Sequence, residues 1–92
     1  MNSRRIINDW LVSWLVDYLD ISQKGISSSV AFSELGLDSV GAVTLVGDLE
    51  SFLQTDLDPT LLWSYPTIVE LIGHVESIGA LENLSEKQLN HA

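Results

Sequence analysis

From Phe32 to Leu53 the chain reads FSELGLDSVGAVTLVGDLESFL, and this stretch carries most of the evidence about the fold. After Ser39, apolar residues recur at the spacing of one helical face: Ala42, Leu45, Val46, Leu49, Phe52 and Leu53. We therefore expect a helix that begins at Asp38 or Ser39, ends near Leu53 and buries this stripe.

The same helix has a second, less apolar face, formed by Val40, Val43, Thr44, Gly47, Asp48 and Ser51. Two glycines, Gly41 and Gly47, stand inside the predicted helix, and each costs roughly 1 kcal/mol relative to alanine. That cost indicates a close approach to the helix, either by another helix of the chain or by an outside partner.

Further helices are predicted on both sides of this one. Residues 4–20 carry an apolar stripe of Ile7, Trp10, Leu11, Trp14, Leu15, Tyr18 and Leu19, in which we expect both tryptophans to pack in the core. The connection that follows, 21–38, is long and rich in loop-forming residues, with a short helical turn expected at 32–35.

The second half of the chain contains two helix starts. Asp58-Pro59 predicts an N-cap followed by proline at the first helical position, and Tyr65-Pro66 ends that helix after about two turns. Thr67 and Glu70 have the spacing of a capping box. Ile68, Leu71, Ile72, Val75 and Ile78 then follow at helical spacing, and Gly79 is a typical helix stop.

Together these elements predict an all-α, four-helix bundle with a long first loop and a short third helix. We expect the folded domain to cover residues 4–79. Residues 80–92 are polar with scattered leucines, which predicts a flexible C-terminal tail or a weak docking helix.

Composition narrows the possible functions. The 92-residue chain has no cysteine, which excludes a disulfide, a thiolate metal site and a thiol nucleophile, and favours the cytoplasm. No apolar run approaches the roughly 20 residues that cross a bilayer, so no membrane association is expected. The first helix is broken by polar residues and is not a signal peptide. Met1 and the short length favour a free-standing protein, which we expect to be a monomer.

The charge is strongly acidic. Thirteen Asp and Glu oppose four Lys and Arg, for a net charge of −9, and no Lys or Arg lies between Gly25 and Glu86. Such a chain repels phosphate backbones, so nucleic-acid binding is excluded. The acidity either provides solubility or attracts a basic partner surface.

Ser39 is the candidate functional residue. Gly36-Leu37-Asp38 places its hydroxyl at a junction between loop and helix, where an enzyme has access to it. A phosphodiester at this position would lie against free backbone N–H groups and the positive end of the helix dipole. The alternative is that Ser39, or Asp38 beside it, does no more than cap the helix.

Two motifs carry a family resemblance. The pattern Phe32-x-Glu34-Leu35-Gly36-Leu37-Asp38-Ser39-Val40-x-Ala42-Val43-x-Leu45-x-x-x-Leu49-Glu50 resembles the acyl carrier domains of modular polyketide synthases. The pattern Leu61-Leu62-Trp63-x-Tyr65-Pro66-Thr67-Ile68 is similar to the junction of the third and fourth helices in that family. The resemblance extends from about Ile6 to Ile78.

The resemblance implies that a phosphopantetheinyl transferase attaches 4′-phosphopantetheine covalently to Ser39. The thiol of that group would hold acyl thioesters for an acyl adenylate ligase or acyltransferase and for a ketosynthase or other acyl-processing enzymes. Flanking the tether, we expect a partner-binding face of Asp38, Val40, Val43, Thr44, Gly47, Asp48 and Glu50.

The chain also departs from relatives of the fatty-acid type. Thr44 and Ser51 stand where those carriers often have Glu, which predicts weaker ionic steering, and Val40 replaces the commoner Leu or Met. Leu37-Asp38 before the serine favours an acyl over a peptidyl carrier. The sequences 47–50 and 61–68 look most like carriers loaded by fatty-acyl adenylate ligases, which suggests a starter acid as cargo.

Three other functions differ from a carrier in the residues that they require. An enzyme would need a base near Ser39, but the two histidines, His74 and His91, lie far along the chain and no Gly-x-Ser-x-Gly elbow exists. No spacing of His, Asp and Glu suggests a metal. A helical interaction module without a prosthetic group, and a peptidyl carrier that holds an aminoacyl thioester, remain alternatives.

Overall fold

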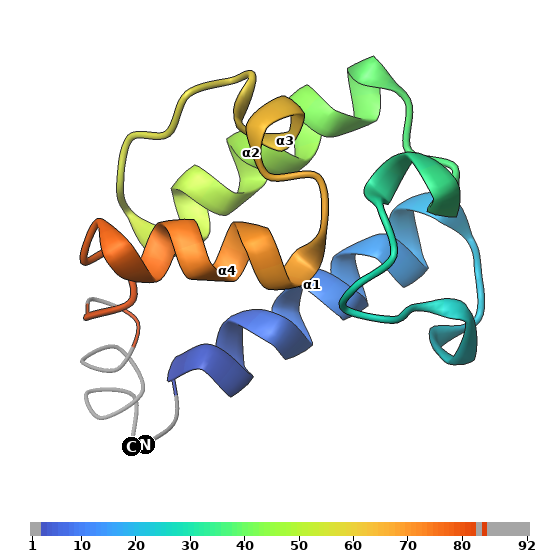
Figure 1. Cartoon of the computed structure of the whole chain (residues 1–92), viewed down its shortest axis with the longest axis horizontal. Coiled ribbons are helices and arrows are strands. Elements are labelled where there is room, and N and C mark those ends of the chain that lie inside the picture. The colour runs from blue at the N-terminus through green and yellow to red at the C-terminus, as the bar shows by residue number, and fades with distance from the viewer. Residues whose placement is uncertain (1–2, 83, 85–92) are drawn as a thin grey trace.

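The computed structural model describes residues 3–82 and 84, which form an all-α bundle (Figure 1). The helices are α1 (Ser3–Leu19), α2 (Ser39–Leu53), α3 (Leu61–Ser64) and α4 (Ile68–Ser77). Two 3-10 turns, η1 (Gln23–Gly25) and η2 (Phe32–Leu35), lie in the long connection between α1 and α2. The predicted four-helix architecture is confirmed, including the long first loop and the short third helix.

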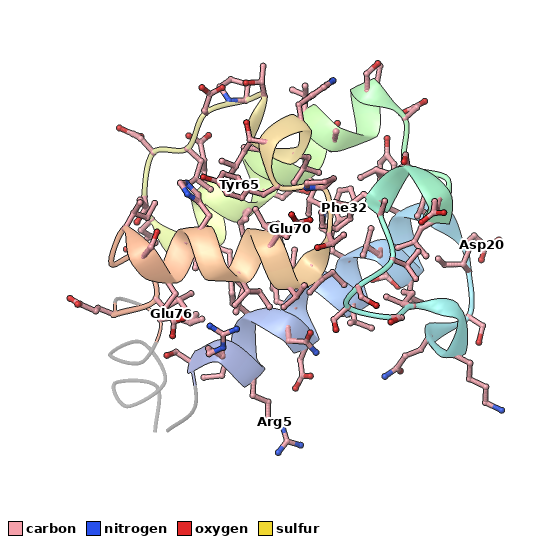
Figure 2. All side chains as sticks on the ribbon, viewed as in Figure 1. Arg5, Asp20, Phe32, Tyr65, Glu70 and Glu76 are labelled. Atoms are coloured by element: carbon pink, nitrogen blue, oxygen red, sulfur yellow. The ribbon has the colours of Figure 1, made fainter. Side chains whose placement is uncertain are left out.

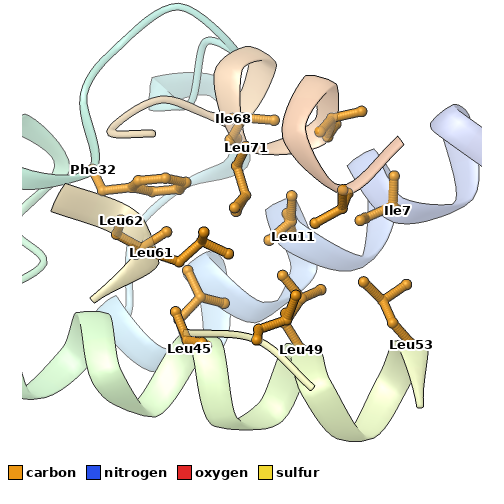
Figure 3. Close-up of a cluster of buried hydrophobic side chains, with 14 of the residues drawn as sticks. Ile7, Leu11, Phe32, Leu45, Leu49, Leu53, Leu61, Leu62, Ile68 and Leu71 are labelled. Carbon is orange, nitrogen blue, oxygen red and sulfur yellow. The ribbon is translucent and has the colours of Figure 1, made fainter. Parts of the chain in front are cut away.

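The core is built from one face of each helix. Figure 3 shows leucines of α2 pointing into one cluster with Leu61 and Leu62 of α3 and with Ile7 and Leu11 of α1. Fully buried side chains come from three helices and the C-terminal segment: Ile7, Leu11, Leu15, Leu45, Val46, Leu49, Leu53, Ile68, Leu71, Val75 and Leu84. The predicted stripe of α2 is buried apart from Phe52, which packs at the edge of the core.

Helices α1 and α4 pack against each other. An ion pair between Arg4 and Glu76 joins the first turn of α1 to the end of α4, and Figure 2 shows Glu76 on the side of α4 toward the start of α1. Within residues 3–82 and 84, no helix combines the length and apolar character needed to cross a bilayer.

The long first loop is held in place by backbone hydrogen bonds. Phe32 N–H donates to the Pro66 carbonyl at 2.8 Å, and Val69 N–H donates to the Ser28 carbonyl at 3.0 Å. Phe32 itself is buried. The loop is therefore fixed against the junction of α3 and α4, as expected for a long loop that packs on the bundle.

Helix α3 begins later than predicted. Its N-cap is Thr60 and its first residue Leu61, so Asp58 and Pro59 precede the helix. Asp58 Oδ1 accepts hydrogen bonds from Thr60 N–H at 2.8 Å and from the Thr60 hydroxyl at 2.7 Å, which closes a turn ahead of α3. Both hydrogen bonds lower the pKa of the Asp58 carboxyl, and the bond from the Thr60 backbone has the larger effect.

Helix α4 begins as predicted. Thr67 Oγ1 accepts a hydrogen bond from Glu70 N–H at 3.2 Å and donates to Glu70 Oε1 at 2.9 Å. Its end also matches the sequence, because Gly79 adopts a left-handed φ of 78° just after the helix.

The buried core continues past residue 79, where the sequence predicts the end of the domain. Ala80, Leu81 and Leu84 are buried in the core, whereas Ile78, predicted on the buried stripe, is 48% exposed. Gly79 has a left-handed φ of 78°, and Ala80, Leu81 and Leu84 after it belong to the core cluster. The remainder of the predicted tail, 83 and 85–92, lies outside the described residues.

Candidate functional site

Ser39 is the first residue of α2, and its hydroxyl is exposed. The cap is made by its neighbour: Asp38 Oδ1 accepts a hydrogen bond from Gly41 N–H at 2.8 Å. Within the described part of the chain, the Ser39 side chain makes no hydrogen bond, so the capping role considered for it belongs to Asp38.

The turn before Ser39 fixes where the hydroxyl points. Gly36 ends η2 with φ 106°, a conformation that favours glycine, and its N–H donates to the carbonyls of Phe32 and Ser33. Leu37 then inserts into the core. Anchored by Leu37 and capped by Asp38, the start of α2 holds Ser39 at the surface.

A pocket of about 320 Å³ opens beside Ser39. Its apolar walls come from η2, the turn before α2, α2, α3 and the turn after α3: Phe32, Leu37, Ala42, Leu62, Trp63 and Pro66. Its polar groups come from Ser33 of η2 and from Asp38 and Ser39 at the start of α2. The site thus combines a free hydroxyl, a helix N-terminus and an apolar recess.

Trp63 is the residue of this site to which sequence reasoning gave no role. It lies in α3, lines the pocket and is exposed. The sequence signal was the Leu-Leu-Trp run, in which Leu61 and Leu62 are both buried. Because Leu61 and Leu62 of this four-residue helix both face the core, the next residue, Trp63, faces outward.

The predicted partner-binding face is divided in the structure. Val40, Val43, Thr44, Gly47 and Asp48 are exposed along α2, as is Asp38 before it. Asp48 also accepts a hydrogen bond from Trp14 Nε1 at 2.7 Å, on the side of α2 toward α1. Glu50 is partly buried, and its Oε2 accepts a hydrogen bond from Leu57 N–H at 2.7 Å. Both acids therefore hold parts of the fold together.

The residues around Ser39 fit a phosphate-linked group. The hydroxyl is accessible, and the first turn of α2 presents backbone N–H groups that lack intrahelical acceptors. The recess beside it has room for an organic arm. In residues 3–82 and 84, no cluster of His, Cys, Asp and Glu could hold a metal ion.

Comparison with known proteins shows which family the chain belongs to. The family model described as "Phosphopantetheine attachment site" matches residues 9–75. The chain belongs to this family. Carrier domains of this family hold 4′-phosphopantetheine covalently on a serine, are modified by a phosphopantetheinyl transferase and are not catalytic themselves.

The carrier protein is similar in sequence to domains of polyketide synthases. It is 38% identical over 60 residues to polyketide synthase PksL of Bacillus subtilis, and the aligned region covers 65% of this chain and 1% of that protein. It is 44% identical over 52 residues to 6-methylsalicylic acid synthase of Aspergillus terreus, covering 56% of this chain and 3% of that protein. The chain thus spans only a few per cent of these relatives.

Solved carrier structures share its fold. A free-standing peptidyl carrier protein from Acinetobacter baumannii aligns with a TM-score of 0.75 and 31% identity, over 83% of this chain and 96% of that one. The HMG-ACPI domain of the CurA module from Lyngbya majuscula aligns with a TM-score of 0.68 and 31% identity, over 74% and 69% of the two chains. The resemblance to phosphopantetheine carriers of the polyketide type is confirmed.

Proposed function

We propose that Ser39 is the attachment serine of this carrier protein, and that the chain presents acyl thioesters to enzymes of a polyketide or fatty-acid pathway. The observation that carries the proposal is the exposed, unbonded hydroxyl of Ser39 beside an apolar pocket, with the helix cap supplied by Asp38. The motif around Ser39 lies inside the matched family region.

Attachment requires only the hydroxyl from this chain. Ser39 Oγ would attack the coenzyme A phosphorus next to the pantetheine arm, forming an O–P bond. The bond from that phosphorus to the bridging oxygen would break, 3′,5′-ADP would leave, and the hydroxyl proton would pass to a base of the transferase. Once bound, the group supplies a terminal thiol, which this cysteine-free chain lacks.

The chain's own residues would position and present the tether. Asp38 fixes the first turn of α2, and the buried leucines of α2 hold the helix rigidly against the core. The N–H groups of that turn favour a negative charge beside Ser39. A long arm on a rigid domain raises the effective concentration of its cargo at several active sites in turn.

Partners would approach over the surface that surrounds Ser39. The proposed face contains Asp38, Val40, Val43, Thr44, Gly47, Asp48 and Glu50. Its partners would be a phosphopantetheinyl transferase, an acyl adenylate ligase or acyltransferase, and a ketosynthase or other acyl-processing enzyme. Similarity to polyketide synthase domains supports this class of partner.

A peptidyl carrier is the second candidate, because the Acinetobacter baumannii structure to which the chain is similar is a peptidyl carrier protein. Leu37-Asp38 before the serine, where peptidyl carriers usually have glycine and histidine, favours the acyl cargo. The two differ in the acid that a partner enzyme loads.

Intact mass spectrometry tests the attachment site. Coexpression with a broad phosphopantetheinyl transferase is expected to add the mass of one phosphopantetheine to the wild type and none to Ser39→Ala. Ser33→Ala, which removes the other serine of the pocket, is expected to keep the added mass. Full modification of Ser39→Ala would place the attachment elsewhere.

The cargo requires a separate test. The pantetheinylated protein is offered to a fatty-acyl adenylate ligase, to an extender-unit acyltransferase and to an amino-acid adenylating enzyme. Loading by the fatty-acyl ligase is expected for a starter carrier. Efficient loading only with malonyl-type units would make this an extension carrier, and loading only with an amino acid would make it a peptidyl carrier.

A further inference from the structure

Exposed apolar side chains surround Ser39. Val40 is 69% exposed, Trp63 57% and Val43 46%. Val40 is the next residue after Ser39, and Val43 follows one helical turn later on the same side of α2. Trp63 stands in another helix and lines the same pocket as Ser39. Exposed apolar groups gathered at one place mark a contact surface more often than isolated ones.

The carboxylates near this surface are already engaged. Asp38 accepts from Gly41 N–H at 2.8 Å and Asp48 from Trp14 Nε1 at 2.7 Å. Glu50 accepts from Leu57 N–H at 2.7 Å. Each of these hydrogen bonds uses one oxygen of its carboxylate. The valines and the indole gain by being covered, because covering them removes apolar surface from water.

We propose that the phosphopantetheinyl transferase docks on this carrier protein through apolar contacts: a recess on the transferase receives Trp63, and Val40 and Val43 lie at the border of that recess. The proposal rests on Ser39 being the attachment site. An enzyme that brings coenzyme A to Ser39 Oγ has to cover the residues immediately around it, and these three are the exposed apolar ones there.

Trp63 is the expected anchor of that contact. A tryptophan offers a large rigid surface with few torsions to immobilise, and tryptophans are enriched among residues that dominate binding energy. Its neighbour Leu62 is buried, so α3 is fixed on the core and the indole is held outward. The docking surface is therefore preorganised, which reduces the entropy lost on binding.

The test is the steady-state rate of phosphopantetheine transfer from coenzyme A to the apo protein, with one broad transferase. Trp63→Ala is expected to lower kcat/KM by about tenfold or more, mainly through KM, because docking contributes to binding before and during the reaction. Val69→Ala is the matched control, since Val69 is also exposed but lies on α4. It is expected to keep the wild-type rate.

Salt separates apolar from ionic docking. Raising the salt concentration screens exposed charges, so the loss of kcat/KM caused by Trp63→Ala is expected to persist at high salt, because the contact that it removes is apolar. Wild-type kcat/KM for Trp63→Ala, an equal loss for Val69→Ala, or a loss for Trp63→Ala that disappears at high salt would each overturn the proposal.

Two further measurements keep the outcome unambiguous. Circular dichroism and thermal melting check that Trp63→Ala is folded; if it is not, Trp63→Gln takes its place in the same assay. Mass spectrometry of the product checks the site: modification away from Ser39 overturns the proposed function, whereas modification of Ser39 at equal rates in wild type and Trp63→Ala overturns only the docking proposal.

Discussion

Gly41 and Gly47 lie in the same helix but have different surroundings. A Cβ at Gly41 would lie 2.6 Å from Leu37 Cδ1 and 3.0 Å from Tyr18 Cε2. A Cβ at Gly47 would meet nothing within 4 Å. The close approach expected from these glycines is therefore made by the chain itself, and only at Gly41. It brings Tyr18 of α1 and Leu37 onto the first turn of α2, next to Ser39.

This contrast gives a matched pair of substitutions. Gly47→Ala is expected to raise the free energy of unfolding by about 0.5–1 kcal/mol, because alanine is the better helix former and has room there. Gly41→Ala is expected to lower it by about 1–2 kcal/mol, because overpacking outweighs the same helical gain. Urea denaturation measures both. An equal gain at the two positions would show that Leu37 and Tyr18 move aside without cost.

At the scale of elements, aromatic residues form the contact between α1 and α2. The ring of Trp10 in α1 stacks on that of Phe52 in α2 with centroids 4.9 Å apart, whereas Trp14 stacks at 4.6 Å on Tyr18 of its own helix. The indole N–H of Trp14 donates to Asp48. Both tryptophans are partly buried at the edge of the core, where they cover the core leucines of the two helices and keep water from them.

The bond between Trp14 and Asp48 is expected to stabilise this contact. A double-mutant cycle of Trp14→Phe and Asp48→Ala should give a coupling of about 0.5–1.5 kcal/mol in the free energy of unfolding, the usual net value of such a hydrogen bond. Ser51 lies on α2, as Asp48 does, but makes no hydrogen bond to Trp14. The effects of Trp14→Phe and Ser51→Ala on the free energy of unfolding should therefore be additive. Additivity in both cycles would mean that the bond contributes nothing in solution.

At the scale of the whole molecule, the core is completed by residues beyond the predicted end of the domain. Leu81 and Leu84 are buried, and Ala80 N–H donates to the Val75 carbonyl at 3.0 Å, continuing the hydrogen bonding past α4. A domain of this size buries a limited fraction of its surface, so each core leucine accounts for a large share of its stability.

Leu84→Ala is therefore expected to lower the free energy of unfolding by about 2–5 kcal/mol, as for other buried leucines. Ile78→Ala, at an exposed position of the same segment, is expected to change it by about 0.5 kcal/mol or less. Thermal and urea unfolding compare the two. If the variants lose similar stability, the C-terminal leucine does not belong to the core.

The features that the sequence alone determined depend on interactions between residues close together in the chain. The bounds of α2 and α4, the turn at Phe32–Leu35 and the place of Ser39 at the start of α2 follow from periodicity, from the capping residues Asp38 and Thr67, and from glycine stops. These signals act between residues a few positions apart, so they can be read along the chain. The family resemblance depends on the same local motifs.

Contacts between distant residues were decided only by the tertiary structure. The start of α3, the exposure of Trp63 and the burial of Leu84 depend on how much space the other helices leave. The bond of Asp48 to Trp14 joins residues 34 positions apart, and no local pattern marks it. Both carboxylates predicted to steer partners, Asp48 and Glu50, therefore turned out to bond within the fold, because packing determined which donors came within reach of them.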